Sequence, residues 1–203
     1  MNLNEEKSFM AKKKMTPIPT PIPTLKIDWI VGFTDGEGCF CVSFSKRKSL
    51  SLNLDVRPSF SVSQKTPSRI VLDALEGHFK CGSIRLSKSD GTHKFEIRSL
   101  DPLMDIIIPF FKTNSLLTEK RKDFETFIRV CELIKSNHHK SKEGMIEIIE
   151  LSVHMNPGGK RKYSREDLLA IVNNAVNKGA KEPAKKAVSG TQKSPKILDE
   201  LKV

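Results

Sequence analysis

The nine residues IVGFTDGEG, at positions 30–38, decide the fold of this chain. With the preceding IDW they predict a short apolar helix that stops at Asp-Gly-Glu-Gly, where a strand begins at once. Gly32 and Gly36 are four residues apart and share one helix face, so a second helix can approach closely there. Glu37 stands at the C-terminal end of the helix, where the dipole is already negative, and a divalent cation would offset that charge. Carboxylate and carbonyl oxygens suit Mg²⁺, although DGEG would equally form a simple turn.

Four segments from the end of the motif onward alternate between apolar and polar residues, which predicts four strands that each bury one face. The first two are EGCFCVSFSKRK, from Glu37, and LDVRPSFSVSQ; the others are SIRLSK and HKFEIRS. Asp90-Gly91 separates the last two and is typical of a tight hairpin. The residues expected to face the core are Phe40, Val42, Phe44, Val56, Phe60, Val62, Ile84, Leu86, Phe95 and Ile97.

Helical patterns interrupt and follow the strands. Thr66-Pro67 starts a helix to about His78. Further helices are expected at about 101–111, 118–135, 142–154 and 164–176. The order αββαββα with C-terminal helices is an α+β fold. In the helix that starts at Thr66-Pro67, the residues expected to be buried are Ile70, Val71, Ala74 and Leu75. Thr118 and Ser164 are the expected N-caps of the helices at about 118–135 and 164–176.

Composition divides the chain into a domain between two tails. Residues 1–24 end in TPIPTPIPT, which favours polyproline conformation and predicts a flexible Pro-rich tail. Residues 181–203 are rich in lysine and predict a basic, mobile tail, which leaves 25–180 as the folded domain. No apolar run approaches the roughly 20 residues needed to cross a bilayer, and the N-terminus lacks a signal core. We therefore expect an intracellular protein without a membrane partner.

None of the four cysteines has a zinc-binding spacing, so all are expected to be reduced thiols: Cys39, Cys41, Cys81 and Cys131.

The chain is strongly basic, with 35 Lys and Arg against 24 Asp and Glu and a formal net charge of +11. Such proteins often bind polyanions, because phosphate neutralisation releases counterions. The polar strand faces combine basic and hydroxyl side chains, which hold phosphates and read base edges. A solvated sheet face alternates in the same way, and the basic residues favour DNA. The expected DNA-binding residues, on and beside the strands, are Ser43, Ser45, Arg47, Arg57, Ser59, Ser61, Ser63, Arg69, Ser83, Arg85, Ser87, Lys94, Glu96 and Arg98.

The stretch IVGFTDGEG resembles the LAGLIDADG motif of homing endonucleases. The resemblance covers roughly residues 27–135 and extends to SVSQKT, which is similar to the end of the family's second strand, and to TEKRKDFETF, which is similar to a later helix. It implies an αββαββα fold with a saddle-shaped antiparallel DNA-binding sheet. It also implies an intron-encoded endonuclease, in a chloroplast or mitochondrion, that makes a double-strand break in double-stranded DNA.

The same resemblance assigns site residues. Glu37 and the Gly36 carbonyl take the place of the metal ligands, which implies Mg²⁺, with Mn²⁺ as a substitute and Ca²⁺ as an occupant that does not support cleavage. Gln64 and Lys120 take catalytic positions, with Lys122 as the alternative lysine. Some members have an arginine where this chain has Ser68, for which the adjacent Arg69 is the candidate substitute.

One motif per chain implies a homodimer and a long pseudo-palindromic target, because one acidic residue must serve each DNA strand. Two alternatives stay open: a maturase that binds intron RNA, and a DNA-binding protein that does not cleave. Asp35 is expected at a helix end or interface. The residues expected at the dimer interface are Ile30, Gly32, Phe33 and Gly36.

Overall fold

The computed structural model describes residues 21–179. Residues 21–24 are exposed and form no regular structure, and the rest of the two expected tails lies outside the described residues. Within the described part, no helix is both long and apolar enough to cross a bilayer.

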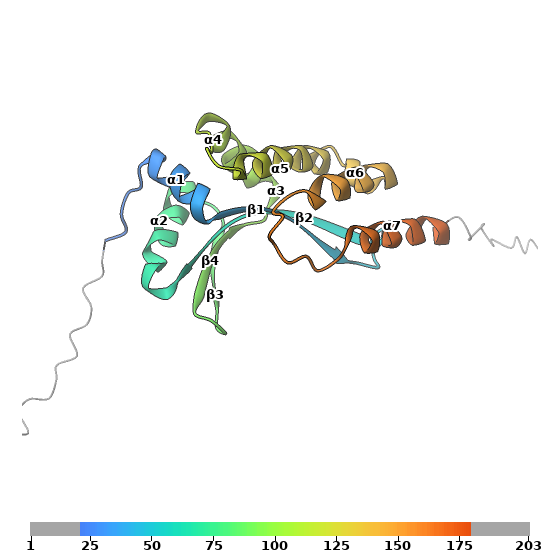
Figure 1. Cartoon of the computed structure of the whole chain (residues 1–203), viewed down its shortest axis with the longest axis horizontal. Coiled ribbons are helices and arrows are strands. Elements are labelled where there is room, and N and C mark those ends of the chain that lie inside the picture. Colours follow the sequence, from blue (N-terminus) through green and yellow to red (C-terminus); the bar gives the residue numbers. More distant parts are fainter. Residues whose placement is uncertain (1–20, 180–203) are drawn as a thin grey trace, which may run out of the picture.

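The described elements follow the expected order and form an α+β fold (Figure 1). Helix α1 leads directly into the first strand, and the last two helices extend the chain beyond the αββαββα unit. The elements are α1 (Ile27–Glu37), β1 (Gly38–Lys46), β2 (Leu54–Lys65), the 3-10 turn η2 (Thr66–Ser68), α2 (Arg69–Phe79), β3 (Ser83–Ser87), β4 (Thr92–Ile97), α3 (Leu100–Pro102), the π turn η3 (Leu103–Ile107), α4 (Ile108–Thr113), α5 (Lys120–Lys135), the 3-10 turn η4 (His138–Lys140), α6 (Lys142–Val153) and α7 (Arg165–Gly179).

The strands form one antiparallel sheet in the order β1-β2-β4-β3. Gly38 pairs with Val62, so the end of the motif lies beside the last part of β2. The expected hairpin joins β3 to β4, and Gly91 there has a φ of +66°, which suits glycine. In Figure 1 the β3–β4 hairpin and the far ends of β1 and β2 both bend away from the helices, so the sheet is arched.

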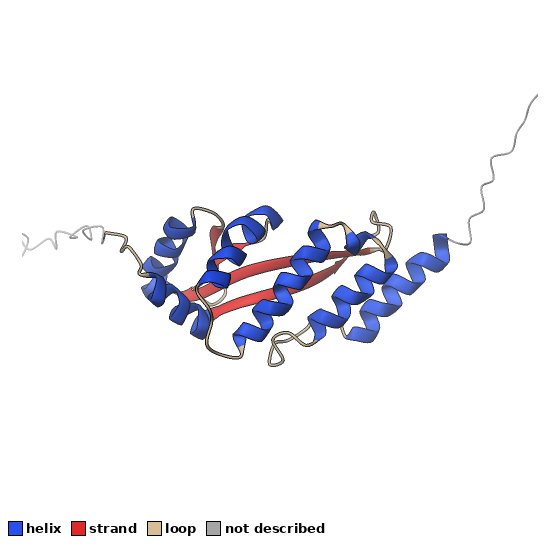
Figure 2. Ribbon diagram, turned by 90° about the horizontal axis from the view of Figure 1, so that it is seen from above, coloured by secondary structure: helices blue, strands red, loops and turns tan. Residues whose placement is uncertain are grey.

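Helices lie over one face of the sheet, as Figure 2 shows from above, and α2, η3 and α5 contact its strands. Phenylalanines from both layers form the core beneath them: Phe40 lies 5.5 Å from Phe111 and 4.9 Å from Phe124 between ring centroids. Phe40, Phe60 and Phe95 are fully buried, which confirms the inward face of β1, β2 and β4. The opposite face of these strands carries the basic and hydroxyl side chains.

Two expectations about burial are wrong. In α2 the buried residues are Leu72, Ala74, Leu75 and Phe79, whereas Ile70 and Val71 are only half-buried. The chain enters α2 through the 3-10 turn η2, so the helix begins at Arg69 and its buried stripe follows the spacing 72, 75, 79. Leu86 is 50% exposed because β3 is a short edge strand beside the hairpin.

The helix expected at about 101–111 exists but changes its hydrogen bonding midway. The π turn η3 separates α3 from α4, and Pro109 stands in the first turn of α4. Proline has no N–H to continue the regular ladder, which accounts for the irregular turn before it.

Candidate active site and nucleic-acid interface

The motif helix ends where the sequence predicts. Glu37 is the last residue of α1 and is exposed, and Gly38 opens β1 directly. A Cβ on Gly38 would lie 2.6 Å from Thr34 Cγ2 and 2.7 Å from the Thr34 carbonyl oxygen. Only glycine therefore allows the chain to pass from helix to strand without a loop, which holds the Glu37 carboxylate at the helix end.

Lys120 reaches this helix end from α5. Its Nζ donates to the carbonyl oxygen of Thr34 at 2.9 Å and of Gly36 at 3.4 Å. Burial lowers the pKa of Lys120 below its usual value, while the charges of Asp35 and Glu37 oppose that shift. Lys122 is exposed and pairs with Glu119 at 2.8 Å. Of the two candidate lysines, the structure thus brings Lys120 to the motif.

Asp35 fixes the position of the start of α5. Its carboxylate accepts hydrogen bonds from the backbone N–H of Leu117 at 2.8 Å and from the hydroxyl of Thr118 at 2.8 Å. Thr118 Oγ1 in turn accepts from the Lys120 N–H at 3.3 Å, but α5 begins at Lys120 and its N-cap is Glu119, which corrects the expected N-cap by one residue. Asp35 is therefore at a helix end, as expected, where it connects the motif to the segment that carries Lys120.

Gln64 and Arg69 lie near the same end of β2 but differ in their contacts. Gln64 is half-buried two residues beyond Val62, the partner of Gly38, and so follows the motif along the sheet. Arg69 donates from Nε to Asp73 Oδ1 at 3.3 Å within its own helix. Arg69 thus pairs with Asp73 on its own helix, and within residues 21–179 it makes no polar contact with the candidate catalytic residues.

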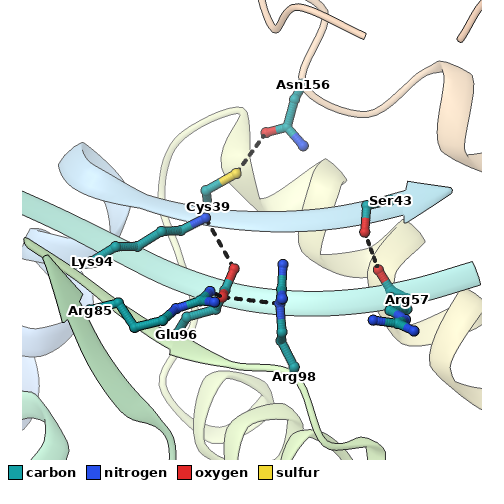
Figure 3. Close-up of polar contacts among 8 residues, drawn as sticks. All are labelled: Cys39, Ser43, Arg57, Arg85, Lys94, Glu96, Arg98 and Asn156. Atoms are coloured by element: carbon teal, nitrogen blue, oxygen red, sulfur yellow. Dashed lines mark hydrogen bonds and ion pairs between the residues drawn. The ribbon is translucent and has the colours of Figure 1, made fainter. Parts of the chain in front are cut away.

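The polar face of the sheet contains two acidic residues paired with basic side chains. Asp55 pairs with Arg57 at 2.7 Å and with Arg47 at 3.6 Å. The Ser43 hydroxyl donates to the Arg57 carbonyl oxygen at 3.1 Å, which ties β1 to β2 (Figure 3). Glu96 contacts three basic side chains and is buried, although its position in the alternation predicts an outward, solvated side chain.

The expected DNA-binding residues are not equally accessible. Ser59 and Ser61 are buried on the inner strand β2, where Ser59 pairs with β1 and Ser61 pairs with both β1 and β4. Ser45, Ser63 and Lys94 are half-buried. The exposed members of the set are Ser43, Arg47, Arg57, Arg69, Ser83, Arg85, Ser87 and Arg98.

A loop that the sequence analysis did not assign adds further positive charge beside β1. Asn156 Nδ2 donates to the Phe40 carbonyl oxygen at 2.8 Å, and the Asn156 N–H donates to Asp123 at 3.0 Å. These bonds hold the segment 155–163 against β1 and leave a cavity of about 350 Å³ that Cys41 and Ser43 help to line. The run Lys160–Lys162 lines the same cavity. A basic run after two glycines was the signal that could have identified it.

The two thiols of β1 titrate differently. A hydrogen bond between them lowers the pKa of Cys41 to about 6, and the nearby cations Lys94, Arg161 and Arg98 act in the same direction while burial opposes it. The same bond, with burial, raises the pKa of Cys39. Within residues 21–179 the cysteines are free thiols, as expected.

The residues expected at the dimer interface also differ in their accessibility. Ile30 is fully buried in its own chain and is not available to a partner, which corrects that expectation. Gly32 and Gly36 are exposed, and a Cβ on either would meet nothing within 4 Å. Trp29 is 41% exposed and stacks on Phe33 with 4.6 Å between centroids. The available face of α1 thus comprises the two glycines with Trp29 and Phe33.

Comparison with known proteins agrees with this fold and motif. The LAGLIDADG endonuclease family model matches residues 30–131. The crystal structure of a homing endonuclease, I-TnaI, is 33% identical with a TM-score of 0.67, over 75% of this chain and 99% of that one. I-SmaMI bound to uncleaved DNA in the presence of calcium ions is 33% identical with a TM-score of 0.66, over 72% of this chain and 48% of that one.

A curated relative, the probable intron-encoded endonuclease 2 of Neurospora crassa, is 30% identical over 73% of this chain. This chain spans only 33% of that protein's length and 53% of a probable intron-encoded DNA endonuclease 1 of Mycosarcoma maydis. The extent of the family match shows that the chain belongs to the LAGLIDADG endonuclease family.

Proposed function

We propose that this protein is a site-specific DNA endonuclease that hydrolyses phosphodiester bonds with a divalent metal ion. The observation that carries the proposal is the convergence of the Glu37 carboxylate, the Gly36 carbonyl and the Lys120 ammonium at the end of α1. This group adjoins an arched sheet whose free face is rich in arginine and lysine. Support comes from I-SmaMI, whose structure is described as bound to uncleaved DNA with calcium ions.

The donor set fits a hard divalent cation. Glu37 and the Gly36 carbonyl are oxygen donors, which Mg²⁺ and Mn²⁺ prefer over nitrogen or sulfur. A bound cation would activate a water and stabilise charge on the leaving oxygen, with Ca²⁺ binding without supporting cleavage. Lys120 holds its positive charge beside these oxygens, where it can stabilise the phosphate in the transition state. Gln64 lies along the same strand and would orient water.

We further propose that the active form is a homodimer on a pseudo-palindromic DNA target. One motif supplies one carboxylate, whereas a double-strand break requires chemistry on two strands. Gly32 and Gly36 leave an open helix face that a second copy can approach closely. This chain also matches nearly all of I-TnaI but about half of I-SmaMI, as expected for one of two similar units.

Cleavage of a duplex that joins the sequences flanking this reading frame tests the proposal. The full chain should cut that duplex in Mg²⁺, and cleavage should stop when the metal is chelated. Glu37→Gln should abolish cleavage and change DNA affinity by less than roughly tenfold. Glu119→Gln is the matched control, because it removes an exposed carboxylate from the start of α5 and should cut normally.

Binding of the duplex without cleavage under all metal conditions would overturn the enzymatic part and favour the DNA-binding alternative. Splicing rescue that persists in Glu37→Gln would favour the maturase alternative, because RNA binding has no need of that carboxylate. Intron-encoded names among the relatives support an intron-encoded gene, and an organellar location stays a prediction.

A further inference from the structure

Glu96 occupies an unusual position for an acidic residue on a surface that would face DNA. Its side chain is 3% exposed, whereas those of Arg85, Lys94 and Arg98 are 55%, 43% and 51% exposed. The carboxylate therefore lies beneath the three cations at the centre of the sheet. Figure 3 shows the three basic side chains converging on it from different sides.

The register of the sheet explains this arrangement. Glu96 lies on the inner strand β4, opposite Ser61 on β2 and Ser83 on β3. Both neighbours are short serines, so the long basic side chains can reach the carboxylate. Lys94 and Arg98 flank Glu96 at two residues on either side of it along the chain, and residues two apart in a strand share one face. Arg85 pairs with Lys94 and reaches Glu96 diagonally.

The contacts use both carboxylate oxygens but only some of the cationic donors. Oε1 lies 3.1 Å from Lys94 Nζ, and Oε2 lies 3.0 Å from Arg98 Nε and also contacts Arg85 Nη2. An arginine has five N–H donors in a rigid fork, so each single contact restrains a guanidinium and leaves other donors for a ligand. Guanine is read by two such parallel donors, which requires that plane to be correctly set.

We infer that Glu96 is a positioning residue, which orients Arg85 and Arg98 for base recognition and offsets part of their attraction to phosphate. The inference rests on the proposed function, because it requires DNA on this face of the sheet. Pre-orientation lowers the entropic cost of immobilising long side chains on binding. The offset charge lowers affinity for every DNA sequence alike, since phosphate attraction carries no sequence information. Together these effects raise the ratio of specific to non-specific binding.

Two substitutions separate the two effects. Glu96→Asp keeps the charge but shortens the side chain by one methylene, so the arginines lose their fixed position. It should lower base preference at the positions that they contact by about 5-fold or more, the lower end of one bidentate contact. Its affinity for a random-sequence duplex should not change. Glu96→Gln also removes the charge, so random-sequence affinity should rise and its salt dependence should steepen by about 0.9 per added phosphate contact.

The experiment selects bound duplexes from a randomised DNA library with the full-length wild type and both variants, in Ca²⁺. It also titrates salt with one random-sequence duplex. Asp101→Asn is the matched control, because it adds the same unit of charge at an exposed residue that pairs with Lys135 on α5. It should leave the selected sequences unchanged. Thermal unfolding of each variant shows whether a change in binding is caused by a loss of stability.

The outcomes are distinguishable. If the wild type selects a preferred sequence and both Glu96 variants select it with the same strength, the inference is wrong while the proposed function stands. If Glu96→Gln loses stability and Glu96→Asp keeps both its fold and the wild-type base preference, the role of Glu96 is only structural. If the wild type selects no sequence, both the proposed function and this inference are wrong.

Discussion

The substitution Gly32→Leu should change the stability of the single chain and the affinity of the dimer in opposite directions. A Cβ at position 32 would meet nothing within 4 Å in the single chain, and Gly32 is exposed, so the leucine side chain is expected to extend into solvent there. Glycine in a helix interior costs about 1 kcal/mol relative to alanine, and leucine is nearly as favourable as alanine. The isolated chain should therefore become more stable by roughly 0.5–1 kcal/mol.

The proposed dimer should respond in the opposite direction. Each added side chain would enter a close helix contact, and overpacking costs about 1–3 kcal/mol at each site. Twofold symmetry repeats the clash, so dimerisation should weaken by about 2–6 kcal/mol, which is roughly 30-fold or more in the dissociation constant. Cleavage should fall in parallel, because the two Glu37 carboxylates would be moved apart.

Sedimentation measures dimer content, and urea unfolding at a concentration where the chain is monomeric measures stability. Gly77→Leu is the matched control, because Gly77 is an exposed helical glycine on α2 where a Cβ would also meet nothing within 4 Å. It should give a similar gain in stability and leave assembly unchanged. A Gly32→Leu chain that dimerises and cuts like the wild type would refute this reasoning. A wild-type monomer that cuts both strands in a one-to-one complex would refute the homodimer itself.

Individual contacts lead to three more expected outcomes. Lys120→Met should lower the cleavage rate by about 10²-fold or more with little change in DNA affinity, whereas Lys122→Met should cut normally; equal losses in single-turnover assays would contradict the assignment. Cys41 should be alkylated by iodoacetamide with a midpoint near pH 6, since its thiolate predominates above a pKa of about 6. Burial raises the pKa of Cys131 to about 12, so Cys131 should stay unmodified at about pH 8. Peptide mass spectrometry gives both rates, and a Cys41 midpoint near pH 9, the ordinary thiol value, would show that its pKa is not lowered. Asn156→Ala should lower the free energy of unfolding by about 1–3 kcal/mol, because it loses the hydrogen bond to β1 at a residue with a φ of +47°, and an unchanged urea midpoint would argue against that anchor.

The sequence by itself determined the local structure of this protein. The helix that ends at Glu37, the alternating strands and the hairpin at Asp90-Gly91 all follow from residue patterns that act over a few positions. The cap of α7 is equally local, because Ser164 accepts a hydrogen bond from the Asp167 N–H at 3.1 Å. The family motif is also contiguous, so the acidic half of the candidate site follows from the order of the residues alone.

Only the tertiary structure decided which members of a pattern act together. Lys120 and Lys122 are both lysines at the start of the same helix, so the sequence does not distinguish between them. The docking of α5 against the end of α1 brings Lys120 to the motif and leaves Lys122 exposed to solvent. Alternation placed Glu96 on the polar face but said nothing of its depth, which depends on the serines and cations that neighbouring strands supply. Ile30 and Asn156 likewise take their roles from partners distant in sequence. Periodicity sets the direction of a side chain, whereas its neighbours, and therefore its charge environment and chemistry, are set by how separate elements pack.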